Sequence, residues 1–201
     1  MKFLKDFYGS YRFTWPVAVL FPVLYLLSLA FALAVRFRRF LYARRVLFSY
    51  RPQARVISIG NITLGGSGKT PLVAYVAGVL SRGSRRVTVL LRGYKRPRAG
   101  RPAAGSDRFC ALGDEGSMLV DILGGKVPVL AAGDRARLAQ RLDSQKASDV
   151  FILDDGFQHL ALKRDLDIVT IDATRPFGNH CLLPAGPLRE EIAALARADI
   201  F

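Results

Sequence analysis

Residues 60–71 read GNITLGGSGKTP, and this stretch decides how the rest of the chain is interpreted. The apolar run 56–59 before it predicts a buried strand, and the apolar segment 71–80 after it predicts a helix. A strand, a glycine-rich loop, Gly-Lys-Thr and a helix form the context in which phosphate-binding loops occur. Glycines let backbone N–H groups turn toward a polyphosphate, and the helix N-terminus adds free donors and its dipole. The stretch therefore predicts a nucleotide-binding loop.

Each residue of this loop has an expected task. Lys69 is placed to reach the β- and γ-phosphates of ATP, and the hydroxyl of Thr70 is placed to bind Mg²⁺. The strict pattern requires glycine where this chain has Thr63. The alternative is an ordinary glycine-rich turn that caps a helix. The residues expected to bind the cofactor are Gly65, Gly66, Ser67, Gly68, Lys69 and Thr70.

The amino-acid composition limits the kinds of binding partner that this protein is expected to have. The 201 residues carry a net charge of +14, which favours an anionic partner such as a phosphorylated substrate or an anionic membrane surface. The positive charge is not gathered in one dense tail, so we expect no nucleic-acid partner, and no motif predicts a protein partner. Two cysteines far apart in sequence, Cys110 and Cys181, form neither a metal motif nor a disulfide framework and are typical of a reducing compartment.

The N-terminal region contains 21 residues without a charge, 15–35. As a helix this run would be about 31 Å long, close to the thickness of the hydrocarbon core of a bilayer. Five arginines follow within ten residues, and the excess of positive charge places that side in the cytoplasm. We therefore expect residues 1–50 to form a membrane-associated helix with a basic segment. A signal peptide and a buried soluble helix are the alternatives.

From residue 51 on, apolar strands alternate with helices. Strands are expected at 55–60, 86–92, 127–131, 149–154 and 167–172, and helices at 70–81, 115–123, 134–145 and 189–198. Nearly continuous apolar strands are typical of a parallel sheet that helices cover on both faces. The predicted fold class is α/β, with a mostly parallel sheet of the P-loop NTPase type, formed by residues 51–201.

Candidate catalytic side chains follow the predicted strands. Asp154 and Asp155 end an apolar strand, where a carboxylate can help to hold Mg²⁺, although Asp-Asp-Gly is also a common turn. Asp114 precedes a helix and is interpreted from the residues alone as an N-cap rather than a general base. Arg92, at the end of the second strand, is either a clamp for a substrate phosphate or part of a solvated basic loop. His159 is interpreted as a surface residue.

Together these motifs resemble the tetraacyldisaccharide 4'-kinase family of lipid A biosynthesis. The resemblance rests on GNITLGGSGKTP at 60–71, RGY at 92–94, GDE at 113–115, DDGFQH at 154–159 and LLPAGPLRE at 182–190. Their order matches, and so does the apolar segment that precedes them. The resemblance covers nearly the whole chain but only about the N-terminal three-fifths of a family member, so the kinase domain is expected to be truncated at its C-terminal end.

The resemblance implies a function. The family transfers the γ-phosphoryl group of ATP to the 4'-hydroxyl of tetraacyldisaccharide 1-phosphate, giving lipid IVA, at the cytoplasmic face of the bacterial inner membrane. The resemblance makes Asp114 the expected catalytic base and gives Lys69, Asp154 and Asp155 catalytic roles. It also implies that Asp154, Asp155 and Thr70 are the ligands of Mg²⁺. The residues expected to bind the lipid substrate are Arg92, Tyr94, Gln158 and Glu190.

The chain departs from the family at Gly116, where the family has proline, and at His180, where it has glycine. The family also pairs its base with a histidine from the C-terminal part, a place that neither histidine of this chain fills. A membrane-tethered ATPase or GTPase and an inactive nucleotide-binding fragment are the alternative functions. No Asn/Thr-Lys-x-Asp element for reading guanine is present.

Overall fold

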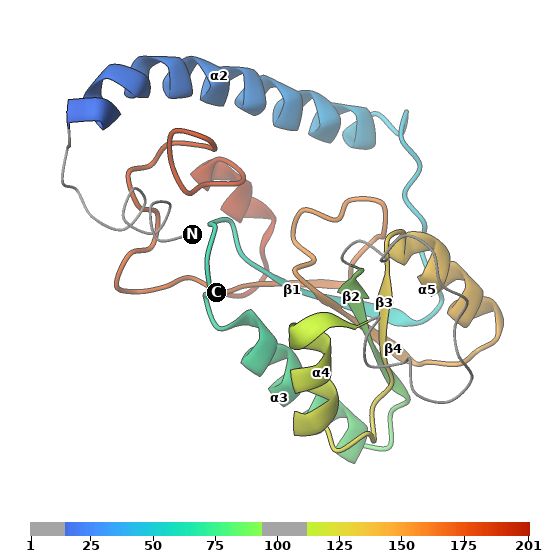
Figure 1. Ribbon diagram of the computed structural model, residues 1–201. Coiled ribbons are helices and arrows are strands. Elements are labelled where there is room, and N and C mark those ends of the chain that lie inside the picture. The colour runs from blue at the N-terminus through green and yellow to red at the C-terminus, as the bar shows by residue number, and fades with distance from the viewer. Residues whose placement is uncertain (1–14, 94–111) are drawn as a thin grey trace, which may run out of the picture.

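A five-stranded parallel sheet forms the centre of the molecule (Figure 1). The computed structural model describes residues 15–93 and 112–201, with side chains from Leu20 onward. The strands are β1 (Arg55–Gly60), β2 (Val87–Arg92), β3 (Val129–Ala132), β4 (Val150–Asp154) and β5 (Leu166–Val169), in the spatial order β3-β2-β4-β1-β5. All the pairs are parallel. The predicted α/β fold class is confirmed.

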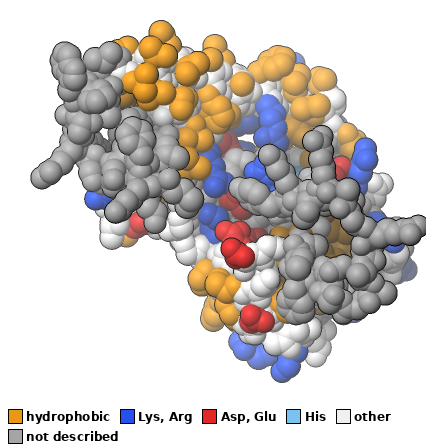
Figure 2. Space-filling view, viewed as in Figure 1, with side chains coloured by type: hydrophobic (Ala, Val, Ile, Leu, Met, Phe, Trp, Pro, Cys, Tyr) orange, Lys and Arg blue, Asp and Glu red, His pale blue; other side chains and the backbone are white. Residues whose placement is uncertain are grey.

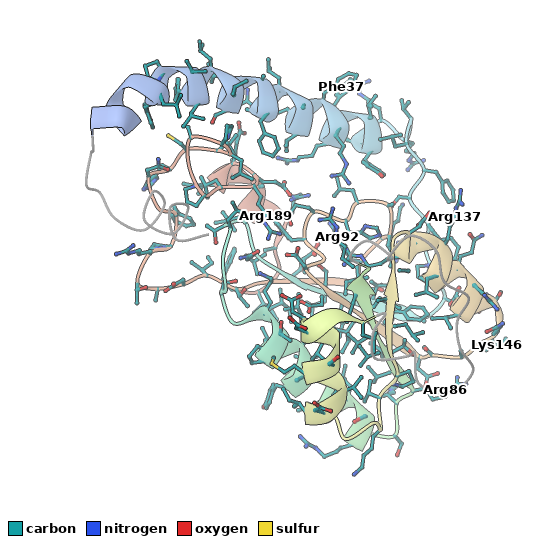
Figure 3. All side chains as sticks on the ribbon, in the orientation of Figure 1. Phe37, Arg86, Arg92, Arg137, Lys146 and Arg189 are labelled. Carbon is teal, nitrogen blue, oxygen red and sulfur yellow. The ribbon has the colours of Figure 1, made fainter. Side chains whose placement is uncertain are left out.

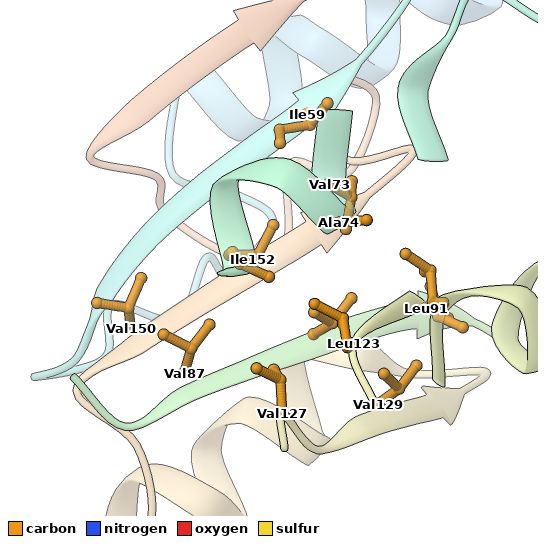
Figure 4. Packing of buried hydrophobic residues seen from close by; sticks show 13 residues of the cluster. Ile59, Val73, Ala74, Val87, Leu91, Leu123, Val127, Val129, Val150 and Ile152 are labelled. Carbon is orange, nitrogen blue, oxygen red and sulfur yellow. The ribbon is translucent and has the colours of Figure 1, made fainter. Parts of the chain in front are cut away.

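Helices cover both faces of this sheet. α3 (Lys69–Arg82) and α4 (Gly113–Ile122) pack on one face, and α5 (Arg135–Ser144) packs on the other. Alternate residues of each strand supply the two sides, so that Val150 and Ile152 face α3 and α4 while Phe151 and Leu153 face α5. Figure 4 shows the first of these cores, in which valine, isoleucine and leucine side chains interdigitate. Burial of these side chains is the main stabilising contribution to the fold.

The strand order places the chemistry at one edge. β1 lies between β4 and β5, and Ile59 of β1 is in register with Asp154 of β4. Because the strands are parallel, the loops after β1, β2 and β4 all leave the sheet at its carboxyl edge. The phosphate-binding loop, Arg92 and the two consecutive aspartates are therefore brought together by the topology.

The N-terminal helix α2 (Trp15–Ala43) is longer than the expected run 15–35. It continues through the arginine-rich segment and lies beside the loops of the carboxyl edge rather than packing on the sheet (Figure 1). Within the described part of the chain, one helix, α2, has a stretch long and apolar enough to cross a membrane, Leu20–Ala43, and of that stretch only Ser28 and Ala32 are buried. The division of the chain at residue 50 stays a prediction.

The expected elements differ from the observed ones at two places beyond small shifts of their ends. The prediction of an α-helix over residues 189–198 is wrong, because only a short 3-10 helix, η1 (Ile192–Arg197), forms there. Residues 188 and 189 are held extended by pairing with the loop after β1, where Leu188 bridges to Thr63 and the Arg189 N–H donates to the Ile62 carbonyl at 2.7 Å. Strand 167–172 is also shorter than expected, since β5 ends at Val169.

Candidate active site

The loop between β1 and α3 has the geometry that anion binding requires. Gly65 and Gly68 have φ angles of 118° and 75°, a region that residues with a Cβ atom seldom enter. Gly68 occupies the N-cap position of α3, and no side chain caps this helix. The N–H groups of the first turn of α3 are thus left for a ligand, and the helix dipole favours a negative one.

The loop is fixed at its base by contacts that involve residues outside it. The hydroxyl groups of Ser67 and Thr170 are 2.8 Å apart, and Thr170 also donates to the Gly60 carbonyl at 3.2 Å. Gly60 itself passes so close to Phe157 that a Cβ atom would lie 2.7 Å from the Phe157 backbone nitrogen. Gln158 donates from Nε2 to the Asn61 carbonyl at 2.9 Å. The loop is therefore held by the segments after β4 and β5.

Lys69 and the two aspartates form the centre of the site. The Lys69 ammonium lies 4.0 Å from Oδ1 of Asp155 and 3.5 Å from the Gly65 carbonyl oxygen. Arg189 donates from Nη1 to both carboxylate oxygens of Asp155 at 2.8 Å. Asp155 has a left-handed φ of 51°, so the chain turns sharply as it leaves β4. Acidic and basic groups lie in the hollow below α2 in Figure 2, and Figure 3 shows Arg92 and Arg189 between the sheet and α2.

Asp154 lies deeper than Asp155. It is only 4% exposed, and burial together with the charges of Glu115 and Asp155 raises the pKa of its carboxyl group to about 6. Burial also lowers the pKa of Lys69, against the opposing effect of Asp155. Arg135 is buried as well and donates to the backbone carbonyls of Asp154, at 2.6 Å, and Asp155, at 3.3 Å. A cation bound beside Asp154 would stabilise its ionised form.

The side chains here fit a magnesium ion that also contacts a polyphosphate. Mg²⁺ prefers hard oxygen ligands and in nucleotide sites uses one or two carboxylates or hydroxyls along with phosphates and water. Thr70, in the first turn of α3, and Asp154 provide such oxygens. No group of three or more His, Cys, Asp or Glu side chains that could hold a metal occurs among the residues the structure describes.

Asp114 does not cap a helix. The N-cap position of α4 belongs to Leu112, and Asp114 lies in the first turn with its side chain exposed. The interpretation of Asp114 as an N-cap is therefore wrong, because the helix begins one residue before it. Its neighbour Glu115 was not predicted from the sequence to belong to the site. The negative charge of Glu115 acts to raise the pKa values of both Lys69 and Asp154.

The expected substrate-binding residues are in different surroundings. Arg92 is exposed at the carboxyl end of β2. Its positive charge, after burial, is one of the causes that lower the pKa of Arg135. Gln158 lies beside the phosphate-binding loop through its bond to Asn61. Glu190 is 3% exposed and pairs at 2.7 Å with Arg197. Tyr94 lies outside the described residues.

His159 is not the surface residue that the sequence indicated. It is half-buried, and its Nε2 atom is enclosed without a hydrogen-bond partner. Burial and the nearby positive charges of Arg135, Arg164 and Arg38 lower its pKa to about 4. The imidazole is therefore neutral at pH 7. The sequence offered no sign of this, since the three arginines come from separate parts of the chain.

The fold and the site together define the class: a P-loop protein of the nucleotide-binding type, in which a phosphate-binding loop faces paired aspartates. Residues 20–201 match the family model described as "Tetraacyldisaccharide-1-P 4'-kinase", and the chain belongs to this family. It is 44% identical over 190 residues to the tetraacyldisaccharide 4'-kinase of Halothermothrix orenii, covering 91% of this chain and 49% of the relative. It is 48% identical over 166 residues to that of Anaeromyxobacter sp. strain K, covering 80% and 43%.

A solved structure shares the fold. The chain resembles "apo" form LpxK from Aquifex aeolicus in complex with ATP with a TM-score of 0.74 and 36% identity, covering 91% of this chain and 57% of that one. The chain spans about half the length of the curated relatives it matches. The resemblance noted from the sequence motifs is confirmed.

Proposed function

We propose that this chain provides the nucleotide-binding half of an ATP-dependent kinase that phosphorylates the 4'-hydroxyl of tetraacyldisaccharide 1-phosphate, giving lipid IVA. One observation carries the proposal: an uncapped helix N-terminus and Lys69 face Asp154, Asp155 and Arg189 at a single edge of the sheet. This arrangement joins donors for a polyphosphate to carboxylates that can hold a cation. Family membership supports the choice of substrate class. The neighbouring LpxK structure, which contains ATP, supports the choice of nucleotide.

In this proposal the backbone of residues 65–68 and the first turn of α3 bind the phosphates of ATP. Lys69 donates to the β- and γ-phosphates and stabilises the negative charge that develops on the transferring group. Thr70 and Asp154 hold Mg²⁺, which neutralises phosphate charge when bound. Asp155 has both of its oxygens bound to Arg189, so we assign to it the positioning of Lys69 and Arg189 rather than direct metal contact.

Asp114 is assigned the role of general base. Its carboxylate is exposed at the N-terminal end of α4, where a sugar hydroxyl of a lipid can reach it from solvent or from the membrane surface. It accepts the proton from the 4'-hydroxyl as the oxygen attacks the γ-phosphorus. Arg92, Tyr94 and Gln158 are assigned to the substrate. Glu190 is assigned an indirect role through Arg197, because its carboxylate is buried in an ion pair.

The protein is proposed to act at the cytoplasmic face of the bacterial inner membrane. Large apolar side chains of α2 are exposed, among them Leu26, Leu33 and Phe37 at 62–66%, and Figure 2 shows apolar side chains gathered along the helix. Arg36 and Arg38 of the same helix contact the body of the protein, at Glu191 and Gln158. A helix that is apolar on one side and docked on the other suits insertion into one leaflet.

The direct test is phosphoryl transfer by the protein expressed from its full reading frame. The purified protein in mixed micelles is given ATP labelled in the γ-phosphate, Mg²⁺ and tetraacyldisaccharide 1-phosphate. The proposal predicts a labelled lipid that thin-layer chromatography separates from the substrate. A disaccharide whose 4'-hydroxyl is blocked serves as the control and should remain unlabelled. Label transfer to the blocked lipid, or none to the free one, would argue against this function.

A further inference from the structure

Ser28 is an unusual residue of α2. Among the described side chains of this helix, only Ser28 and Ala32 are buried, and Ser28 is 4% exposed. The apolar residues around it, such as Leu27 and Leu29, are exposed. The helix therefore turns one small polar side chain toward the protein and its large apolar side chains outward.

The Ser28 hydroxyl binds the loop 182–188, the first seven residues of the motif LLPAGPLRE. Its Oγ lies 2.8 Å from the Leu182 carbonyl and 3.0 Å from the Leu24 carbonyl within the helix, so its one hydrogen serves these two acceptors. The same oxygen accepts the backbone N–H of Ala185 at 3.0 Å. Ala185 is fully buried, and its N–H would lose this acceptor if the hydroxyl were removed.

The loop 182–188 is closed on itself and has little room to adjust. The Leu183 N–H donates to the Leu188 carbonyl at 2.9 Å, and the Gly186 N–H donates to the Leu182 carbonyl at 2.9 Å. Any Cβ atom at Gly186 would collide with Asn179 Oδ1 and the Cys181 carbonyl. A displacement at Ala185 is thus passed on to the end of the loop rather than absorbed within it.

The far end of the loop supports the nucleotide site. The Leu64 N–H donates to the Pro187 carbonyl at 2.7 Å, and the Arg189 N–H donates to the Ile62 carbonyl at 2.7 Å. Leu64 immediately precedes Gly65 of the phosphate-binding loop, and Arg189 holds Asp155 beside Lys69. The two bonds between the Ser28 hydroxyl and the loop 182–188, followed by the backbone hydrogen bonds of Pro187 and Arg189, therefore connect Ser28 with both sides of the phosphate site.

We propose that Ser28 is a positioning residue that couples the membrane-facing helix α2 to the phosphate-binding loop through the loop 182–188. The inference rests on the proposed function, since it assigns the site to ATP. In physical terms, the seat of α2 on the protein body and the geometry of the ATP site stabilise one another. Binding of the helix in the lipid leaflet then favours the arrangement of residues 62–69 and Arg189 that holds ATP.

Ser49 provides a matched control. It follows α2 in the chain, and its hydroxyl also donates to a backbone carbonyl of the protein body, that of Leu160 at 2.7 Å. Leu160 belongs to the segment after β4, and this bond does not lead into the loop 182–188. Ser49→Ala therefore removes the same kind of contact between the N-terminal segment and the body without involving the loop 182–188.

The experiment compares Ser28→Ala with Ser49→Ala in the protein expressed from its full reading frame, reconstituted in phospholipid vesicles. Three quantities are measured: the fraction bound to vesicles, the affinity for a fluorescent ATP analogue, and kcat and KM for ATP. We expect Ser28→Ala to weaken analogue binding or kcat/KM for ATP roughly 2- to 30-fold, the range for residues that modulate coupling without contacting a ligand. Vesicle binding should stay as in wild type, and Ser49→Ala should lie within about twofold of wild type.

A double-mutant cycle with Arg189→Lys separates coupling from a general loss of stability. If Ser28 acts through Arg189 and the loop before it, Ser28→Ala should have a smaller effect on ATP affinity in the Arg189→Lys background than in wild type. Equal ATP affinities for Ser28→Ala and Ser49→Ala would overturn the inference, and additive effects in the cycle would overturn the route through the Arg189 side chain. If wild type itself binds no ATP analogue, it is the proposed function that fails, and this outcome is distinct because it does not depend on Ser28.

Discussion

Arg189 holds both carboxylate oxygens of Asp155 with one nitrogen, Nη1, at 2.8 Å. The same carboxylate lies 4.0 Å from the Lys69 ammonium, so two cations from distant parts of the chain share one anion. Asp155 directly follows β4, and Arg189 directly follows the loop 182–188. Their contact therefore joins the sheet to the Pro/Gly-rich motif. The side chains of Asp155 and Arg189 are each about one quarter exposed, and an incoming phosphate can compete for Arg189.

Arg189→Leu should lower kcat/KM for ATP by roughly 10- to 100-fold, the loss expected when a catalytic lysine and its neighbours are misplaced by about 1 Å. The reason is that Asp155 loses its principal partner and draws Lys69 toward itself. Arg137→Leu is the matched control, because Arg137 lies on α5 with its side chain 87% exposed. Steady-state kinetics at varied ATP concentration check the prediction. Equal losses in the two variants would show that the Asp155–Arg189 contact has no part in binding ATP.

Asp114→Asn should lower kcat by about 10²- to 10⁴-fold, the usual cost of losing a general base, while ATP affinity stays near wild type. The amide keeps the size of the side chain but cannot take the proton of a sugar hydroxyl. Asp121→Asn, on the exposed side of the same helix α4, is the control and should be active. A wild-type turnover rate for Asp114→Asn would remove Asp114 from the mechanism.

The strands and the phosphate-binding loop could be predicted because each depends on a local pattern of residues in the sequence. Continuous apolar runs identified β1, β2 and β4, and the glycine spacing identified the phosphate-binding loop between β1 and α3. The paired aspartates were predicted for the same reason, since a parallel sheet gathers the carboxyl ends of its strands.

The partners of those residues were not predictable. Arg189 and Arg135 approach the aspartates from segments about 20 to 35 residues away in sequence. Helix 189–198 failed because pairing with residues 62–63 outweighs its helical propensity. No local pattern in the sequence predicts which backbone N–H and carbonyl groups of a distant loop will form hydrogen bonds with a given segment.

His159 gives the protein a pH dependence with a definite sign. Its pKa is lowered from 6.5 to about 4 in the folded state, so the unfolded chain binds more protons between these values. Its contribution to stability is therefore present above pH 6.5 and is lost as the pH falls toward 4. His159→Gln should lose less stability than wild type between pH 7 and pH 5, as measured by the urea midpoint in detergent. Parallel pH profiles for the two proteins would contradict this account.

The exposed face of α2 should determine membrane binding. Replacing Leu26 and Leu33, 66% and 64% exposed, with Asp places two charges on the face proposed to enter the leaflet. We expect this double variant to appear in the supernatant after an alkaline carbonate wash, whereas wild type stays with the membranes. Tyr75→Asp is the control, because Tyr75 is 68% exposed on α3 and away from α2. Release of wild type by the same wash would exclude an embedded helix.

The measurement closest to the central claim is phosphoryl transfer to tetraacyldisaccharide 1-phosphate by wild type, Lys69→Ala and Lys126→Ala, each expressed from the full reading frame. Lys69 is the lysine of the phosphate-binding loop, with its side chain 13% exposed, and Lys126 is an exposed lysine after α4. The account predicts label in the 4'-phosphate of the lipid for wild type and Lys126→Ala. For Lys69→Ala it predicts none above background, with unfolding transitions like those of wild type. Transfer by Lys69→Ala at the wild-type rate under saturating ATP would contradict it.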